Sequence, residues 1–248
     1  MIERVDRSWT SPAKTSEIIA RAVADQIIEE DLEPGARLPP EREMVENFGV
    51  GRSTLREALR LLETRGVISI KRGPGGGPVV RRPGPEDLSE SLSLLLQFRE
   101  ASLMDVLDAR RALEPMAARL ASERVDAETL SELQDTIDLM RDSKGDSRSF
   151  SRQNWLFHRL ISKAASSTIL QIFIDSLQAL WDGASIGVEY DEYRQTRTAD
   201  AHQRIVDALA QNDPSHAERA MHEHLDEATH YWTKYYEHLM AQRLRWTR

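Results

Sequence analysis

The stretch PGARLPPEREMVENFGVGRSTLREALRLLETRGVISIKRGPGGGPVV, residues 34–80, decides the fold of the first part of the chain. Before it, apolar residues recur at helical spacing until the Pro34-Gly35 turn. Proline suits the first turn of a helix and glycine its end, so Pro40 and Gly49 bound a second helix. We expect helices over about 15–30, 40–48 and 52–65, and strands over 67–70 and 79–80. Three helices followed by a hairpin is the layout of a winged helix-turn-helix.

The third of these helices has the features of a DNA-reading helix. Arg52, Arg56 and Arg60 are four residues apart and share one face. The opposite face carries the apolar residues that we expect to dock on the rest of the domain, namely Leu55, Ala58, Leu59 and Leu62. Arginine is the usual bidentate partner of guanine in the major groove, and hydroxyls at the helix start, from Ser53 and Thr54, can donate to phosphates. The alternative is a solvated face laced by glutamates, namely Glu57 and Glu63.

Charge divides the chain into two parts. The 248 residues carry a formal charge of −8, which taken globally argues against a nucleic-acid binder. Residues 34–82, however, hold ten basic and five acidic residues, +5 in all, so the remainder carries −13. All seven histidines lie between His158 and His238. This uneven distribution predicts two domains with two functions.

A segment rich in glycine and proline, KRGPGGGPVVRRPGPED at 71–87, marks the boundary between the domains. We expect a winged helix-turn-helix DNA-binding domain over residues 1–82, with 1–12 disordered, and an all-helical domain over 83–248, to which the family resemblance described below assigns effector binding and dimerisation. After the boundary, apolar residues recur at helical spacing with short stops, which predicts an antiparallel bundle of six or seven helices. The fold class is therefore mainly α, with one small β-hairpin.

The composition excludes several kinds of site. The chain has no cysteine, which removes disulfides, thiolate zinc sites, iron–sulfur clusters and cysteine nucleophiles. Any metal must therefore be held by His, Asp, Glu or Asn. No stretch approaches the roughly 18–20 apolar residues of a membrane span, and the N-terminus has no apolar signal segment. We expect a cytoplasmic protein with no membrane partner.

The histidines of the second domain have a spacing that favours a metal site. Asn154 and His158 are four residues apart on one helical face. Asp213, in the turn of a predicted helical hairpin, lies eleven residues from each of His202 and His224. Residues equidistant from such a turn lie at the same height, so these two side chains can face each other. Three converging histidines suit a divalent metal, for which we expect zinc, with nickel or manganese as alternatives. The other interpretation is that each histidine is buried for structural reasons alone.

Residues 34–76, from PGARLPPERE to the wing KRGPGG, resemble the GntR family of bacterial transcription regulators almost residue for residue. The resemblance implies DNA contacts by Arg42, Arg52, Ser53, Thr54 and Arg56, with Arg72 and Gly73 at the wing tip. Two positions depart from the family pattern. Pro40 replaces a serine before ERE, and Gly51 replaces the serine or threonine before the recognition arginine. Glycine caps a helix but offers no hydroxyl, so we expect weaker phosphate anchoring with function retained.

Three further segments resemble the FCD-type ligand-binding domain of the FadR-like GntR subgroup: SLMDVLDARRALEPMAARLAS, NWLFHRLI and AHQRIVDALAQNDPSHAERAMHEHL. Members of that subgroup bind a divalent metal through one Asp and three His, which implies four ligands here: Asn154, His158, His202 and His224. The Asp position is Asn154 in this chain, a neutral and usually weaker ligand. The resemblance also implies that a small organic acid effector meets the metal and an arginine, for which Arg110 is the candidate by position. The other interpretation of Arg110 is a surface salt bridge to Glu114 on the same helix face.

Together these features predict a ligand-responsive transcription regulator, a repressor, and not an enzyme. We expect a homodimer to bind a palindromic double-stranded operator with half-sites about 34 Å apart, and bound effector to alter the spacing of the recognition helices. One alternative is a metal-dependent hydrolase that uses the histidines, although His222-Glu223-His224 is not an HExxH motif. A DNA-compacting or scaffolding protein is another, for which a histidine-lined interior would be unnecessary.

Overall fold

The computed structural model describes residues 12–73, 76–143, 145–180 and 188–244, which form two compact units that divide between Asp87 and Leu88. The sequence places this boundary earlier, after residue 82. The difference arises because Asp87 binds back to the first unit: its Oδ2 atom accepts a hydrogen bond from the N–H of Gly84 at 2.8 Å, and its Oδ1 atom lies 3.5 Å from Arg81. The disorder predicted for residues 1–12 lies outside the described residues except at Pro12, where the first helix begins.

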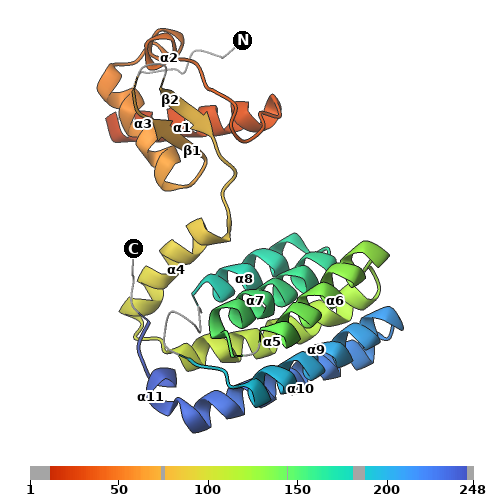
Figure 1. Ribbon diagram of the computed structural model, residues 1–248. Coiled ribbons are helices and arrows are strands. Elements are labelled where there is room, and N and C mark those ends of the chain that lie inside the picture. The colour runs from red at the N-terminus through yellow and green to blue at the C-terminus, as the bar shows by residue number, and fades with distance from the viewer. Residues whose placement is uncertain (1–11, 74–75, 144, 181–187, 245–248) are drawn as a thin grey trace. The chain divides into compact units, whose positions relative to one another are not determined.

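The first unit contains three helices and a two-stranded hairpin in its described residues, as the sequence predicts (Figure 1). Its elements are α1 (Pro12–Glu29), α2 (Glu41–Phe48), α3 (Arg52–Thr64), β1 (Ile68–Lys71) and β2 (Gly77–Val80). Pro40 precedes α2 and is not its first residue, because its ψ of 147° is extended. Gly49 ends α2 in the left-handed region, at φ 59°, which turns the chain directly toward α3.

The core of the first unit lies between α1 and the apolar face of α3. The four apolar residues predicted to dock are all buried: Leu55, Ala58, Leu59 and Leu62. They belong to one cluster with Ile19, Ala20 and Val23 of α1. Burial of each larger aliphatic side chain contributes about 1.5–3 kcal/mol. This packing fixes the rotation of α3 and leaves its arginine face in solvent.

The hairpin that follows α3 pairs with a further backbone segment that the sequence does not predict. Strands β1 and β2 are antiparallel, with Ile68 opposite Val80 and Lys71 opposite Gly77. A third backbone segment, residues 35–38, pairs with the outer side of β2 through one isolated bridge, from Arg37 to Val79. The N–H of Val80 donates to the carbonyl of Ala36 at 2.9 Å within this segment. The wing is thereby attached to the chain that leads into α2.

The second unit is all-helical in its described residues, which confirms the predicted class (Figure 1). Its helices are α4 (Pro85–Phe98), which begins before the division between the units, α5 (Leu103–Ser122), α6 (Ala127–Asp142), α7 (Ser147–Ala164), α8 (Thr168–Ala179), α9 (Glu192–Ala210), α10 (Pro214–Tyr235) and α11 (Glu237–Met240). The bundle itself consists of α5 to α10, within the predicted six or seven helices. No helix in the described residues is long and apolar enough to cross a membrane.

Helix α5 lies at the centre of the bundle and packs against α7, α8, α9 and α10. Helices α9 and α10 form the predicted hairpin around Asn212, which takes a left-handed φ of 52°. Asp213 caps α10 by accepting a hydrogen bond from the N–H of His216 at 3.0 Å. Large apolar side chains, including Leu107, Ile137 and Phe157, fill the interior. The histidine site lies within this packed interior.

Candidate DNA-binding surface and candidate metal centre

The exposed face of α3 presents the residues predicted to read DNA. Arg52, Ser53 and Arg56 are exposed and Thr54 is half-buried, at the N-terminal end of the helix. Gly51 precedes α3 as its N-cap with extended backbone and makes no side-chain cap, as its lack of a hydroxyl requires. The N–H groups of this first turn therefore remain available to an anion.

The glutamates of α3 do not neutralise its arginines. The Oε1 atom of Glu63 accepts a hydrogen bond from the backbone N–H of Ile70 at 3.0 Å, which ties the helix to β1. Among the described residues, Arg52 and Arg60 pair with no carboxylate. Arg56 is held from α2 instead, since its Nε atom donates to Oε2 of Glu41 at 2.9 Å. These observations disfavour the solvated-face alternative.

Two more predicted DNA contacts lie outside α3. Arg42, on α2, is exposed and forms an ion pair with Glu46 at 3.2 Å. Arg72 and Gly73 are exposed where the chain leaves β1, and Gly73 has a left-handed φ of 99°. The turn is tight, because a Cβ atom on Gly76 would lie 2.3 Å from the carbonyl oxygen of Lys71. The contacts of all these residues with DNA stay predictions.

In the second unit the structure brings three histidines from three helices together. His158 comes from α7, His202 from α9 and His224 from α10, and all three are buried. The Nε2 atom of His224 lies 3.3 Å from the Nε2 atoms of both other histidines. One ligand nitrogen from each histidine lies within 4.8 Å of the others. The hairpin spacing around Asp213 thus places His202 and His224 next to each other, with their rings at 75°.

Two of the three nitrogen spacings in this cluster match those of a tetrahedral metal site. Two nitrogens bound to one zinc at about 2.0–2.1 Å and a tetrahedral angle lie about 3.3 Å apart, which is the spacing of two of the three pairs. Burial lowers the pKa of His202 and of His224 well below the usual value, with the nearby histidines and Arg110 adding to it. Both imidazoles are therefore neutral at pH 7, the form that binds metals.

A buried carboxylate, that of Glu114, lies on the Nδ1 side of His158. The Oε2 atom of Glu114 lies 2.6 Å from Nδ1 of His158, and its Oε1 atom accepts a hydrogen bond from Nε of Arg110 at 2.6 Å. Burial alone raises the pKa of Glu114, but the charges of Arg110 and His158 outweigh it and hold the pKa well below its usual value. A carboxylate on the far nitrogen of a metal-binding histidine orients the ring and increases its basicity.

The salt bridge between Arg110 and Glu114, read from the sequence as one possibility on the surface, is present but buried. Both side chains are less than 5% exposed. The surface placement is wrong because α5 lies at the centre of the bundle, where neighbouring helices cover the face that carries both residues. Glu114 was not predicted as part of the site, and only its spacing from Arg110 and its place in the family motif pointed to it.

Asn154 lies beside the cluster, half-buried, on the face of α7 that also carries His158. It lines a small cavity of about 10 Å3 with His158, His224 and Arg110, enough room for one water molecule or ion. Arg194 of α9 also lines this cavity. Nothing in its sequence context, EYRQTRTAD, marked it as buried. Three of the four implied ligands and Arg110 therefore adjoin one space, while His202 reaches the cluster through its contact with His224. Their roles stay predictions.

A winged helix-turn-helix unit followed by a helical bundle defines a class of protein, the DNA-binding transcription regulators that carry a second, helical domain. Residues 15–76 match the family described as bacterial regulatory proteins, gntR family, and residues 105–227 match the FCD domain. The chain belongs to the GntR family of bacterial regulators and carries an FCD domain. This membership confirms that the protein is a transcription regulator and not an enzyme.

Relatives match over nearly the whole chain. The HTH-type transcriptional regulator YcbG of Bacillus subtilis is 33% identical over 220 residues, 86% of this chain and 91% of that protein. The HTH-type transcriptional repressor NanR of Cronobacter sakazakii is 28% identical over 230 residues, 88% of this chain and 85% of its own. Among solved structures, Streptococcus agalactiae GntR has the same fold, with a TM-score of 0.67 at 24% identity, covering 87% of this chain and 99% of that one.

Proposed function

We propose that this regulator is a cytoplasmic homodimeric repressor whose helical domain binds a small carboxylate effector through a divalent metal, with zinc the expected ion and nickel or manganese the alternatives. The observation that carries the proposal is the convergence of His158, His202 and His224 inside the bundle. Histidines buried only for packing have no reason to direct three Nε2 atoms at one point.

The residues present would hold the metal by three imidazole nitrogens and the side-chain oxygen of Asn154. A bound divalent metal supplies a Lewis acid that attracts the oxygens of a carboxylate. Glu114 orients His158, and the buried position of the cluster excludes bulk water. The Nδ1 atom of His202 has no hydrogen-bond partner in the described residues, so this ring is held by packing, chiefly against Phe157 at 3.7 Å between ring centres.

Arg110 is the proposed partner of the effector, whose carboxylate can enter only if the small inner cavity beside Arg110 opens. The Nε atom of this arginine is held by Glu114 at 2.6 Å, and its side chain lines the cavity beside Asn154 and His158. The planar fork of the guanidinium suits a carboxylate. Because the fourth metal ligand is a neutral amide, the site keeps more positive charge than one with an aspartate, which favours an anionic effector.

On DNA, two copies of α3 would enter successive major grooves of a palindromic operator, about 34 Å apart. A symmetric site needs two copies of the chain. Helix α8 offers a surface for their association: Ile169, Ile172 and Phe173 lie on one helical face and are exposed, with Ile169 at 71%. We assign this face to contact with a second copy.

A metal-dependent hydrolase is not proposed. The letters GASIG at 183–187 fit the GxSxG pattern but lie outside the described residues. That motif requires a strand that turns into a helix, and the second unit has no strand in its described part. Family membership also speaks for a regulator.

The proposal is tested by operator retardation with zinc-loaded and chelator-treated protein, each with and without a panel of small organic acids. We expect one acid to release the operator from the zinc-loaded protein and to raise its melting temperature by linkage. The same acid should have little effect after chelation. If no acid changes operator affinity in either form, the effector assignment is wrong.

A further inference from the structure

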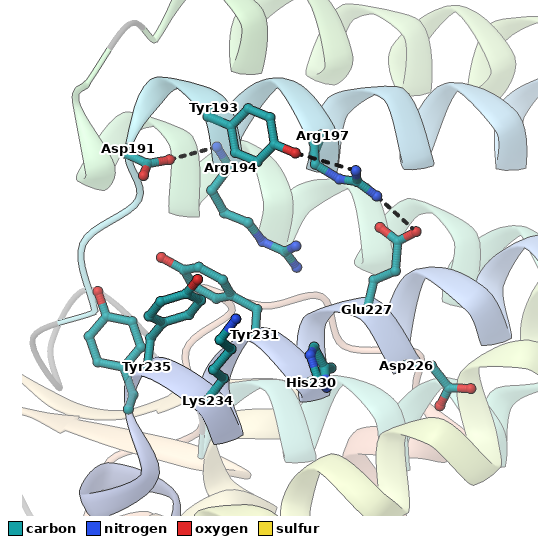
Figure 2. Close-up of a pocket in the computed structure, with 11 residues that line it drawn as sticks. Asp191, Tyr193, Arg194, Arg197, Asp226, Glu227, His230, Tyr231, Lys234 and Tyr235 are labelled. Carbon is teal, nitrogen blue, oxygen red and sulfur yellow. Dashed lines mark hydrogen bonds and ion pairs between the residues drawn. The ribbon is translucent and has the colours of Figure 1, made fainter.

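A pocket of about 750 Å3 lies between the N-terminal end of α9 and the C-terminal end of α10 (Figure 2). This volume falls within the range of about 300–1,000 Å3 usual for small-molecule sites. None of the three clustered histidines lines it. Within the described residues, its wall shares only Arg194 with the inner cavity. The pocket is therefore a separate concavity that adjoins the histidine site through one side chain.

The carboxylates of this pocket are already engaged by groups of the protein. Asp191 caps α9 and accepts a hydrogen bond from a backbone N–H of that helix at 2.7 Å. Glu227 lies 3.3 Å from the guanidinium of Arg197. Asp226 accepts a hydrogen bond from Nε of Arg111 at 2.7 Å. Each lining carboxylate therefore already has a closer partner than the side chain of Arg194 or of Lys234.

Arg194 is a cation of this pocket without an acidic partner in the described residues. It is 8% exposed, and its guanidinium lies 4.6 Å from the centre of the Tyr231 ring. Its Nε atom is buried without a hydrogen-bond partner. Burial lowers the pKa of the Arg194 guanidinium. Figure 2 shows this side chain directed into the space between the two helices, where its planar fork can receive a carboxylate.

A second cation and flat aromatic faces complete the pocket. Lys234 lies 5.2 Å from the centre of the Tyr235 ring and pairs with no carboxylate in the described part of the chain. The rings of Tyr231 and Tyr235 lie 5.0 Å apart. Tyr193 and Tyr235 are 70% and 59% exposed. Exposed tyrosine faces beside unpaired cations favour a ligand that is flat on one side and negatively charged.

We propose that this outer pocket binds an organic acid whose carboxylate is attached to a six-membered ring, with the carboxylate on Arg194 and the ring against Tyr231 and Tyr235. Lys234 attracts the anion from the open side. The ring is aromatic or a sugar, since both present a face that stacks on tyrosine. This binding depends neither on metal at the histidines nor on DNA.

The test is calorimetric titration of the full chain, after chelation and again after zinc loading, with two probes: benzoate for the aromatic ring and glucuronate for the sugar ring. We expect at least one probe to bind the chelated protein. Arg194→Gln should weaken that binding by about tenfold or more, equivalent to about 1.4 kcal/mol. Lys234→Gln should weaken it several-fold, because an exposed charge contributes less. The probe that binds identifies the ring.

Arg141→Gln is the matched control, since this exposed arginine pairs with Asp200 on another part of the bundle. It should bind the probe as the wild type does. If Arg194→Gln does not fold, Arg194→Lys takes its place. This variant loses the planar fork and should weaken binding, but it keeps the charge and should weaken binding less than glutamine would. Absence of binding by both probes at about 10 mM, where even weak sites fill, overturns the proposal, as does unchanged binding by the Arg194 variants. Failure of metal uptake or operator release leaves this measurement intact.

Discussion

The Nδ1 atom of His158 lies 2.6 Å from the Oε2 atom of Glu114, and both side chains are buried in the bundle. A proton on Nδ1, beside this carboxylate, leaves the Nε2 lone pair directed toward the other two histidines. The same carboxylate holds Arg110. One buried glutamate therefore connects the two groups proposed to act on metal and effector.

Glu114→Gln is expected to lower both stability and metal affinity. The change leaves Arg110 buried without its counter-ion, which costs about 3–5 kcal/mol in buried pairs. Loss of the carboxylate behind a ligand histidine lowers metal affinity about 10- to 100-fold. Chemical denaturation of chelated protein and zinc titration against a competing chelator measure the two effects. Glu218→Gln, in the exposed pair with Arg119, should change stability by less than about 1 kcal/mol. Equal effects of the two substitutions would contradict the assignment.

His202→Ala is expected to abolish metal binding. We predict about one divalent ion per chain in the purified wild type, because three histidines are a common protein ligand set for zinc. Elemental analysis after dialysis against zinc gives the ratio. The control is His222→Ala, an exposed histidine that lies 3.0 Å from Asp226, and it should keep its metal. A metal-free wild type after zinc loading would mean that the buried histidines are structural.

Asn154→Asp is expected to tighten the metal site. The substitution adds a charged ligand beside His158 with almost no change in volume, and divalent ions bind carboxylate more strongly than amide oxygen. Competition titration should show an affinity about tenfold higher, or about 1.4 kcal/mol. Asn154→Ala makes the opposite change, because it removes the amide oxygen, and it should weaken metal binding. If neither substitution moves the affinity, Asn154 lines the cavity without contacting the ion.

Arg52→Ala and Arg56→Ala are each expected to abolish sequence-specific retardation of an operator selected from random duplexes. A bidentate arginine–guanine pair contributes about 1–3 kcal/mol of discrimination. Folding should be unaffected, because the Arg56–Glu41 pair is exposed. Arg65→Ala, an exposed position just after α3, is the matched control and should bind normally. Wild-type retardation by both recognition-helix variants would remove α3 from the DNA interface.

Phe173→Glu is expected to convert the protein to a monomer. The side chain is exposed on the apolar face of α8, so the new charge disrupts an interface there without disturbing the core. Light scattering after size exclusion gives the mass, and operator affinity should fall with it. Leu139→Glu makes the same change at a half-exposed position of α6. A Phe173→Glu protein that stays dimeric places the interface elsewhere.

Most of the fold could be predicted from the sequence, because local signals decide it. Gly49 and the prolines set the limits of the helices, and the 3.6-residue period of Leu55 to Leu62 fixes which side of α3 is buried. The convergence of His202 and His224 followed from their distances to Asp213. The pairing of residues 35–38 with β2 could not be predicted, because a single bridge leaves no alternating pattern.

The burial of charged residues inside the bundle could not be predicted from the sequence. An arginine four residues before a glutamate usually marks an exposed helix face, yet Arg110 and Glu114 are buried. Arg194 lies among polar residues that give no sign of burial. In each case the environment is set by helices distant in the sequence. Helix α5 exposes Asp105, Asp108 and Met116 on one face, whereas neighbouring helices cover the face that carries Arg110 and Glu114.

In the protein without DNA, Arg56 already forms a hydrogen bond with Glu41. Its Nε atom donates to Glu41, so a nucleic acid that takes this nitrogen must displace a carboxylate of the protein first. A duplex that meets Arg56 only with phosphates gains little from that exchange, whereas a site that places a guanine edge there would gain a bidentate pair in return. Glu41, the first residue of α2, thus competes with DNA for Arg56. This competition lowers the affinity for every duplex, and it lowers the affinity for non-operator duplexes most.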